Sequence, residues 1–278
     1  MVIRAALAAL MLLTTGPAIA NDDRPLLLGT TTSVDNSGIL KFLMRGFHGD
    51  TGIEVRTIVR GTGAILQLGR SGDFDIILVH DEAAERAFVG EGAGATRNLV
   101  MTSRFLIVGP AEDPANVRSA TDAPTALVRI AAGKHRFISR GDDSGTNTAE
   151  LRLWSQANID PRAASGLWYR ETGSGMGATL NVASAMTAYV FTESGSWANF
   201  SNRGDLEILS IDGPGLRNPY GIIPVNPTRH PHVAADAARR LVDWLTGPAG
   251  QTAIAGFRVN GEQPFQPASA LPATPANR

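Results

Sequence analysis

The sequence predicts an α/β fold with mainly parallel strands and a chain divided between two lobes. Short apolar runs rich in strand-forming residues alternate with segments of helical period, a pattern typical of strands joined by helices. With 43% hydrophobic residues, the chain has enough apolar material for one large or two modest domains. Two apolar strands bracketed by Gly and Pro, at Arg104 and Asn218, favour the two-lobed arrangement.

Each apolar run is assigned to a strand and each segment of 3.6-residue period to a helix. The expected strands are 26–28, 53–59, 74–80, 105–108, 136–139, 188–192, 206–211 and 220–225. The expected helices are 37–49, 146–157, 177–185 and 233–245. In the first helix, one face collects the apolar residues Ile39, Leu40, Leu43, Met44 and Phe47.

The strands RFLIVGPAEDP, from Arg104, and NPYGIIPVNP, from Asn218, are expected to cross between the lobes. They make 111–217 an insert that forms one lobe, and they assign 21–110 with 218–267 to the other. Residues 268–278 are rich in Pro and Ala without periodicity, which predicts a disordered tail.

The first twenty residues predict an export signal. One arginine precedes an apolar run at 5–13, and Ala18-Ile19-Ala20 is the small-x-small pattern that signal peptidase reads, so cleavage is expected after Ala20. The apolar run is shorter than the roughly 20 residues needed to span a bilayer. The mature protein is therefore expected to be exported and not embedded in the membrane.

Composition and motifs exclude several classes of function. The chain has no cysteine, so its stability must come from a buried core, and its net charge of −1 gives no nucleic-acid footprint. It lacks a G-x-S-x-G elbow, an H-E-x-x-H motif, a P-loop and a dinucleotide fingerprint. Only His230 and His232 have spacing suited to a metal, and a proline between them in a polar turn is more typical of surface. We therefore expect no catalysis, no cofactor and no bound metal cation.

Four small, hydroxyl-rich turns are the most informative feature, because each lies between a strand and a helical segment. They are GTTTS at 29–33, GTG at 61–63, SRGDDSGTN at 139–147 and GSGMG at 173–177. Helix N-termini at the carboxyl ends of strands present N–H donors, and glycine lets the backbone approach a ligand closely. Such a site suits a small anion that only accepts hydrogen bonds. Ordinary helix capping explains any one of these turns, but explains all four together less well.

The third turn adds charge through Arg140, Asp142 and Asp143. The arginine suits an oxyanion, whereas the two carboxylates repel one. We expect both carboxylates to turn out of the cleft, one capping the helix near Thr146 and one balancing Arg140. If both faced inward, a cation site would be favoured instead. Arg140-Gly141-Asp142 also spells a cell-adhesion tripeptide, which requires exposure.

A set of ordered motifs resembles the TupA-type periplasmic tungstate-binding proteins. The resemblance runs from about Leu27 to Pro267. It is carried by TTTS at 30–33, GTG at 61–63, LVH at 78–80, EGAG at 91–94, SRGDDSGT at 139–146, GSGMG at 173–177 and NPYGIIPVNP at 218–227. It implies a type II periplasmic binding fold, with an oxyanion in a cleft between two lobes joined by two hinge strands. It also implies tungstate or molybdate as ligand, and the permease and ATPase of an ABC importer as partners. We expect a monomer.

Carried onto this chain, the resemblance implies oxyanion contacts in all four turns. They are Thr31, Thr32, Ser33, Thr62, Gly63, Arg140, Ser144, Gly145, Thr146, Ser174, Gly175 and Met176. The chain departs from the family at Asn147, where histidine is common, and at Asp81, where alanine is common. Neither departure replaces a predicted donor, so they bear on selectivity more than on binding.

Three alternatives remain open from the sequence. The first is a site for phosphate or sulfate, in which Asp142 or Asp143 would accept the proton of a phosphate. The second is an exported hydrolase with Ser144 or Ser174 as nucleophile, although neither loop contains a histidine base. The third is an adhesion protein that uses the Arg140 tripeptide.

Overall fold

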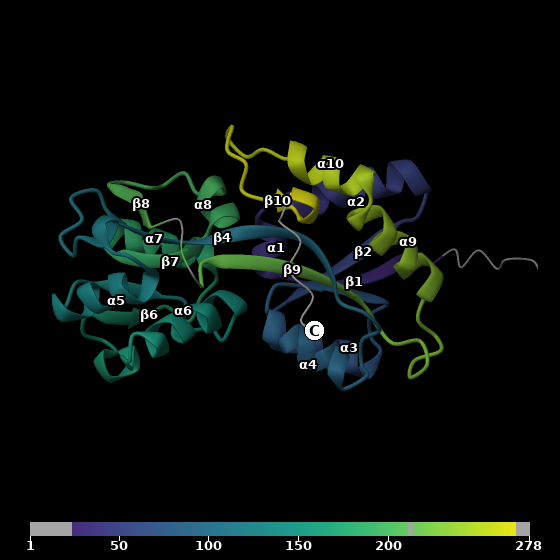
Figure 1. Ribbon diagram of the computed structural model, residues 1–278, viewed down its shortest axis with the longest axis horizontal. Coiled ribbons are helices and arrows are strands. Elements are labelled where there is room, and N and C mark those ends of the chain that lie inside the picture. Colours follow the sequence, from purple (N-terminus) through teal and green to yellow (C-terminus); the bar gives the residue numbers. More distant parts are fainter. Residues whose placement is uncertain (1–23, 211–212, 214, 271–278) are drawn as a thin grey trace, which may run out of the picture.

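The computed structural model describes residues 24–210, 213 and 215–270. It shows two lobes that lie end to end and are connected by long strands (Figure 1). The predicted export signal and its cleavage site lie outside the described residues. Residues Ala268–Ala270 form a short 3₁₀ helix, η3, so the predicted disorder is wrong for these three residues, and the remainder of the tail lies outside the described part.

The first lobe is a sheet of order β2-β1-β3-β9-β4, with β10 beside β4. Its strands are β1 (Leu26–Thr31), β2 (Val55–Arg60), β3 (Ile76–Val79), β4 (Asn98–Pro110), β9 (Arg217–Pro224) and β10 (Gln266–Pro267). Its helices are α1 (Thr32–Asn36), α2 (Ile39–Thr51), α3 (Thr62–Ser71), α4 (Glu82–Gly90), α9 (Ala235–Thr246) and α10 (Pro248–Gly256). One face packs against α2, α9 and α10 and the other against α3 and α4 (Figure 1).

The second lobe continues the sheet as β4-β7-β5-β6, with β8 also beside β4. Its strands are β5 (Phe137–Ser139), β6 (Tyr169–Glu171), β7 (Tyr189–Glu193) and β8 (Leu206–Ser210). Its helices are α5 (Ala123–Ala132), α6 (Gly145–Gln156), α7 (Met176–Met186) and α8 (Ser194–Asn199), with 3₁₀ helices η1 (Val117–Ser119) and η2 (Pro161–Ala164). The core is again two-sided, with α5 and α6 on one face and α7 and α8 on the other.

Strands β4 and β9 connect the lobes, as the Gly- and Pro-bracketed runs predict. β4 pairs with β9 up to Arg104 and with β7 from Phe105 onward, so it changes partner between two successive residues. Every pair that includes β4 or β9 is antiparallel, whereas β1 with β2 and β3, and β5 with β6 and β7, are parallel. Parallel pairing is thus limited to the outer strands. The strand pairing favours a first lobe boundary near Arg104, earlier than residue 110; the lobe limits remain a prediction.

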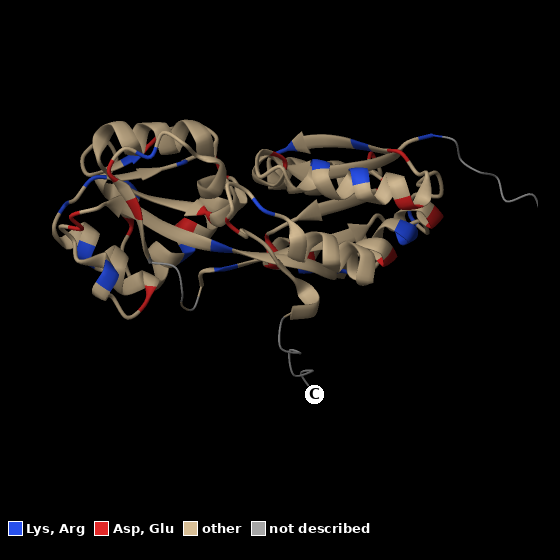
Figure 2. Cartoon of the chain, turned by 90° about the horizontal axis from the view of Figure 1, so that it is seen from above, with Lys and Arg blue, Asp and Glu red and all other residues tan. Residues whose placement is uncertain are grey.

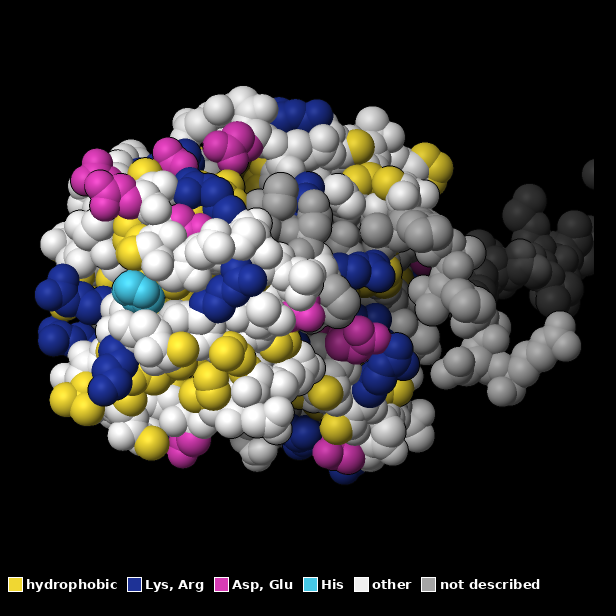
Figure 3. Space-filling model, turned by 60° about the vertical axis from the view of Figure 1, so that its left-hand side comes forward, with side chains coloured by type: hydrophobic (Ala, Val, Ile, Leu, Met, Phe, Trp, Pro, Cys, Tyr) yellow, Lys and Arg dark blue, Asp and Glu magenta, His cyan; other side chains and the backbone are white. Residues whose placement is uncertain are grey.

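Charged residues of both signs are interspersed over the two lobes (Figures 2 and 3). This distribution agrees with the net charge of −1. Among the described residues, no helix is both long and apolar enough to cross a bilayer.

Candidate functional site

The candidate site lies where the carboxyl ends of the parallel strands face the junction of the lobes. The four turns predicted from the sequence all occur at strand-to-helix junctions. They lead from β1 into α1, from β2 into α3, from the loop after β5 into α6 and from the loop after β6 into α7. The predicted contacts therefore belong to helix N-termini, where first-turn N–H groups lack partners within the helix.

Three of these helix N-termini have no side-chain cap within the described part of the chain. Thr31 before α1, Gly61 before α3 and Gly175 before α7 make no side-chain capping hydrogen bond. α4 and α5 are capped by Asp81 and Asp122, whereas α2, α8, α9 and α10 also have no side-chain cap. An uncapped N-terminus is therefore not particular to these three turns, but it leaves their first-turn N–H groups available to a ligand.

The fourth of these N-termini, that of α6, is capped by Ser144, whose Oγ accepts from the backbone N–H of Asn147 at 3.3 Å. The prediction that an aspartate caps this helix is therefore wrong. A serine hydroxyl placed directly before the helix reaches the first-turn N–H groups, which is the geometry of an N-cap.

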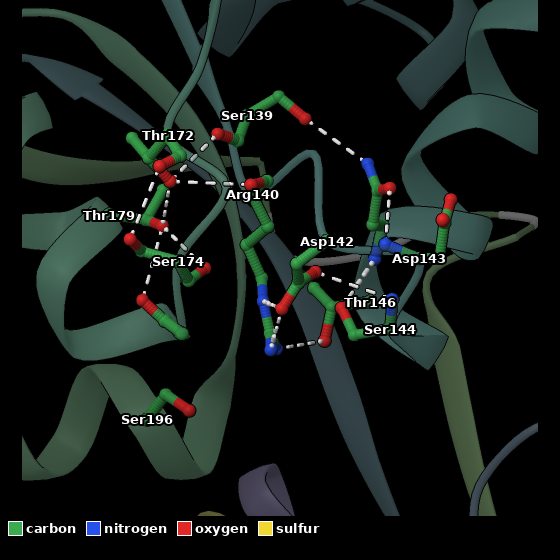
Figure 4. A network of polar contacts seen from close by, with 12 residues as sticks. Ser139, Arg140, Asp142, Asp143, Ser144, Thr146, Thr172, Ser174, Thr179 and Ser196 are labelled. Carbon is green, nitrogen blue, oxygen red and sulfur yellow. Dashed lines mark hydrogen bonds and ion pairs between the residues drawn. The ribbon is translucent and has the colours of Figure 1, made fainter. Parts of the chain in front are cut away.

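Arg140 is almost completely buried, with 3% of its surface exposed. Its Nε and Nη2 donate to Oδ2 of Asp142 at 3.1 and 2.6 Å, and its Nη1 donates to Oγ1 of Thr146 at 3.4 Å. Figure 4 shows the side chains of Asp142 and Thr146 on the same side of the guanidinium, with Asp143 farther away. Asp143 is exposed and has a left-handed backbone φ of 53°. The prediction that one aspartate balances Arg140 is confirmed, and it is Asp142.

A second buried carboxylate, Glu193, lies at the end of β7 and was not predicted. Thr146 Oγ1 donates to Glu193 Oε1, and Ser196 Oγ donates to Glu193 Oε2 at 3.0 Å. Because the proton of Thr146 is engaged in this way, Thr146 can serve an anion mainly through its backbone N–H. Glu193 is 47 positions from Thr146 in the chain, and no local motif marks it.

Two buried polar side chains, Asn147 and Ser139, stabilise the Arg140 loop through hydrogen bonds. Asn147 donates through Nδ2 to Ser139 Oγ at 3.2 Å and accepts from the N–H of Asp143 at 3.3 Å, so it closes the loop on itself. Ser139 Oγ in turn donates to Glu150 Oε2 at 2.7 Å. Burial raises the pKa of Glu150 to about 7, although Ser139 and two aromatic donors oppose the shift.

The turn before α7 is tied directly to the Arg140 loop. Thr172 Oγ1 donates to the carbonyl of Arg140 at 3.3 Å, and Ser174 Oγ donates to the carbonyl of Thr172 at 3.2 Å. The side chain of Met176 is buried in the core of the second lobe. Ser174, Gly175 and Met176 therefore stay beside the site, and Gly175 and Met176 can contribute only backbone groups.

In the first lobe, the predicted hydroxyl residues follow β1 and β2. Thr31, Ser33 and Thr62 are buried and Thr32 is half-buried, while Gly63 is exposed. Oγ1 of Thr31 has no hydrogen-bond partner among the described residues. A buried hydroxyl without a partner is costly unless a ligand or water completes it.

The two lobes meet at Gly145, the first residue of α6. A Cβ added to Gly145 would lie 3.2 Å from Cε1 of His80 and 3.4 Å from Oγ1 of Thr62. Two predicted site residues from different lobes, Thr62 and Gly145, are thus brought into contact. His80 follows β3 and was given no role by sequence reasoning, although the LVH motif at 78–80 contains it.

Comparison with known proteins agrees with this geometry. The PBP superfamily domain matches residues 15–249. The tungstate-binding protein TupA of Peptoclostridium acidaminophilum is 39% identical over 234 residues, which cover 84% of this chain and 81% of the relative. The structure of the tungstate-binding protein TupA from Desulfovibrio alaskensis G20 is 42% identical, covers 88% of this chain and 99% of its own, and superposes with a TM-score of 0.79. This chain belongs to the TupA family.

A second TupA-related structure, titled the tungstate ABC transporter from Geobacter sulfurreducens, is 43% identical with a TM-score of 0.76. It covers 85% of this chain and all of its own. Membership of the TupA family confirms the predicted type II periplasmic binding fold, with two α/β lobes and two connecting strands. The two departures from the family fall in different places: Asn147 is buried in the first turn of α6, and Asp81 caps α4.

Two cavities lie near the junction of the lobes in this TupA-family chain. The smaller, of about 100 Å³, is bounded by His80, Asp81, Gly145 and Arg152, among other residues of both lobes. The larger, of about 400 Å³, lies along β4 and the 262–266 segment and contains none of the predicted oxyanion contacts. The smaller cavity contains one of the predicted oxyanion contacts, Gly145, and none from the turns before α1, α3 and α7.

The geometry does not support the hydrolase, metal-binding or adhesion hypotheses. Across the described residues, no hydrogen bond joins a histidine ring to Ser144 or Ser174, as a hydrolase would require. Nε2 of His230 and His232 donates to backbone carbonyls, and no group of three metal-ligating side chains occurs in the described ranges. The burial of Arg140 removes the adhesion reading, since that tripeptide must be exposed.

Proposed function

We propose that this protein binds a fully deprotonated tetrahedral oxyanion, tungstate, in the cleft between its lobes and delivers it to an ABC importer. The observation that carries the proposal is the buried guanidinium of Arg140 at the N-terminus of α6, in a loop that is hydrogen-bonded to the segment before α7. Each charge-assisted hydrogen bond contributes about 1.5–3 kcal/mol, so several of them offset much of the cost of dehydrating a dianion.

The proposed contacts come from both lobes. The hydroxyl groups are those of Thr31, Thr32, Ser33 and Thr62, and the backbone donors belong to Gly63, Ser144, Gly145, Thr146, Ser174, Gly175 and Met176. Because ligand would bridge the lobes, its binding favours the closed arrangement, with no covalent bond made or broken. The protein is thus proposed to be a monomeric, exported, periplasmic carrier and not an enzyme.

The acidic groups beside Arg140 are already hydrogen-bonded. They are Asp142 and Glu193, and both accept from Arg140, Thr146 or Ser196. Tungstate and molybdate carry no proton at neutral pH and are nearly equal in size, so molybdate is expected to compete. The choice of tungstate rests on the names of the TupA relatives.

Native mass spectrometry tests the proposal directly. Protein incubated with micromolar tungstate and then desalted is expected to carry the mass of one tungstate, and Arg140→Ala is expected to lose it. A wild-type protein that retains no oxyanion under these conditions would overturn the proposed function.

A further inference from the structure

His80 is a buried histidine whose ring is bonded on one side only. Its exposed surface is 5%, and it stacks on Tyr220 with 5.0 Å between ring centroids. Nδ1 lies 3.1 Å from Oδ1 of Asn218. The Nδ2 of Asn218 donates to Ser103 Oγ and to the hydroxyl of Tyr220, so Oδ1 is the acceptor and Nδ1 of His80 is the donor. Nε2 is buried and has no partner in the described part of the chain.

The ring of His80 lies at the candidate site. Its Cε1 and Nδ1 lie 3.2 and 3.6 Å from the position of a Cβ on Gly145, and Thr62 Oγ1 lies 3.4 Å from the same position. The small cavity between the lobes also borders His80. The ring, with its Nε2 unpartnered among the described residues and bonded to Cε1, therefore lies beside the junction where the second and third turns meet.

Charged groups from several elements face His80. Burial is the largest influence and lowers its pKa; Glu193 of β7 and the adjacent Asp81 oppose the shift, and Arg140 adds to it. The cavity that borders the ring also carries Glu82, Arg152 and Arg217. In the empty cleft the ring is therefore neutral, with its proton on Nδ1 and a lone pair on Nε2. A lone pair that faces an anion is repulsive, whereas an N–H there would be a donor.

We propose that His80 contacts the bound oxyanion and that its Nε2 takes up one proton from solvent when the anion binds. The Nε2 lone pair forms the new N–H bond, the ring becomes an imidazolium, and this N–H donates a charge-assisted hydrogen bond to an oxyanion oxygen. The inference rests on the proposed function, because the anion supplies the negative charge that favours protonation. Between the pKa of free and of bound protein, affinity falls as pH rises, by up to about tenfold per pH unit.

Isothermal calorimetry with tungstate measures this proton directly. Titrations at pH 6, 7 and 8, each in two buffers of different ionisation enthalpy, report the number of protons taken up per anion bound. Phosphate and sulfate buffers are omitted because both are candidate ligands. Wild-type protein is expected to take up as much as one proton and to bind more weakly at pH 8 than at pH 6.

Two substitutions distinguish the roles of the two ring nitrogens of His80. His80→Asn places an amide N–H near Nδ1, which retains the contact with Asn218 and removes Nε2. It is expected to abolish proton uptake and to weaken tungstate binding at pH 6 by at least tenfold. His80→Gln places a neutral amide near Nε2, so it is expected to bind more tightly than His80→Asn, with little dependence on pH.

The outcomes distinguish the inference from the proposed function. If wild-type protein binds tungstate without proton uptake and His80→Asn binds equally well, His80 has no such role, and the proposed function stands. If wild-type protein binds no oxyanion, both fail. If His80→Asn does not fold, ¹⁵N NMR of the five wild-type histidines tests the proton uptake instead. One histidine ring is expected to become doubly protonated when tungstate is added. If every ring keeps the charge it had before tungstate was added, the inference is overturned.

Discussion

Arg140 and Asp142 form a partly buried ion pair in which Nε and Nη2 of the guanidinium both donate to the same carboxylate oxygen, at 3.1 and 2.6 Å. The pair is local, since the two residues are two positions apart, and it lies directly before the N-terminus of α6. Asp142 thus holds the guanidinium in place and at the same time offsets the charge that an anion would meet. The charge of Arg140 is only partly available to a ligand.

Removing the carboxylate of Asp142 should therefore strengthen oxyanion binding. Asp142→Asn keeps an oxygen for the N–H of Ser144, which now donates to Oδ1 of Asp142 at 3.3 Å, and it releases the positive charge of Arg140. We expect the affinity for tungstate to rise roughly tenfold, which corresponds to about 1.4 kcal/mol of binding free energy. Calorimetry with tungstate measures this change. Asp143→Asn is the matched control because Asp143 is exposed; equal effects of the two substitutions would contradict this account.

Removing the guanidinium should weaken binding. Arg140→Ala deletes the buried positive charge and leaves Asp142 without its partner, so tungstate affinity is expected to fall by at least tenfold. Arg136→Ala serves as a control, because Arg136 is exposed and lies just before β5. An affinity of Arg140→Ala equal to that of the wild type would place Arg140 outside the site.

A methyl group at Gly145 should obstruct the contact between the lobes. The added Cβ would lie 3.2 Å from His80, a tight contact that worsens if the lobes close further. Gly145→Ala is expected to weaken tungstate binding several-fold without lowering the melting temperature, because alanine favours a helix by up to about 1 kcal/mol over glycine. Gly49→Ala in α2 meets no described atom within 4 Å and should leave affinity unchanged. Unchanged affinity in Gly145→Ala would show that this junction does not form around the ligand.

Glu150 predicts a pH dependence of stability. Its pKa in the folded protein is about 7, above the ordinary value of 4.5, so the folded state holds a proton that the unfolded state releases. Folding favours the neutral form of Glu150. The resulting contribution to the free energy of unfolding is present at low pH and is lost as pH rises from about 4.5 to 7. The loss amounts to roughly 3 kcal/mol for a shift of this size.

Thermal unfolding from pH 5 to pH 8 checks this expectation. Glu150→Gln cannot lose a proton, so its melting temperature should fall less with pH than that of the wild type and exceed it at pH 8. Glu54→Gln is the control, because Glu54 is exposed. Parallel melting curves for Glu150→Gln and the wild type at all pH values would refute the assignment.

The four turns and the crossing strands were predictable because their information is local. Small and hydroxyl residues directly after an apolar run specify a strand that ends at a helix N-terminus, whichever lobe the run belongs to. The helices at 146–157, 177–185 and 233–245 were found within two residues of α6, α7 and α9. Of these, α9 carries a clear apolar face, whereas α6 and α7 are marked by the turns that precede them.

Several of the missed features depend on weak local patterns or on distant contacts, whereas α3, α4 and α5 were missed although each has an apolar face. Strand β6 has three residues and α8 has six, too few to display a period, and α10 is rich in glycine and alanine. The first half of β4 was missed because polar residues such as Thr102 and Ser103 interrupt its apolar run. His80 and Glu193 are single residues at strand ends. The position of His80 beside Gly145 depends on the approach of the other lobe, and Glu193 bonds Thr146, which lies 47 positions away in the same lobe. Asp142 pairs with Arg140 only two positions away, but the sequence does not show which of the two aspartates does so.

Competition calorimetry with tungstate, molybdate, sulfate and phosphate tests the central claim most directly. The account predicts that tungstate and molybdate bind at micromolar concentration or below and displace each other from one site, and that phosphate binds far more weakly. Failure of all four oxyanions to bind at micromolar concentration would contradict it.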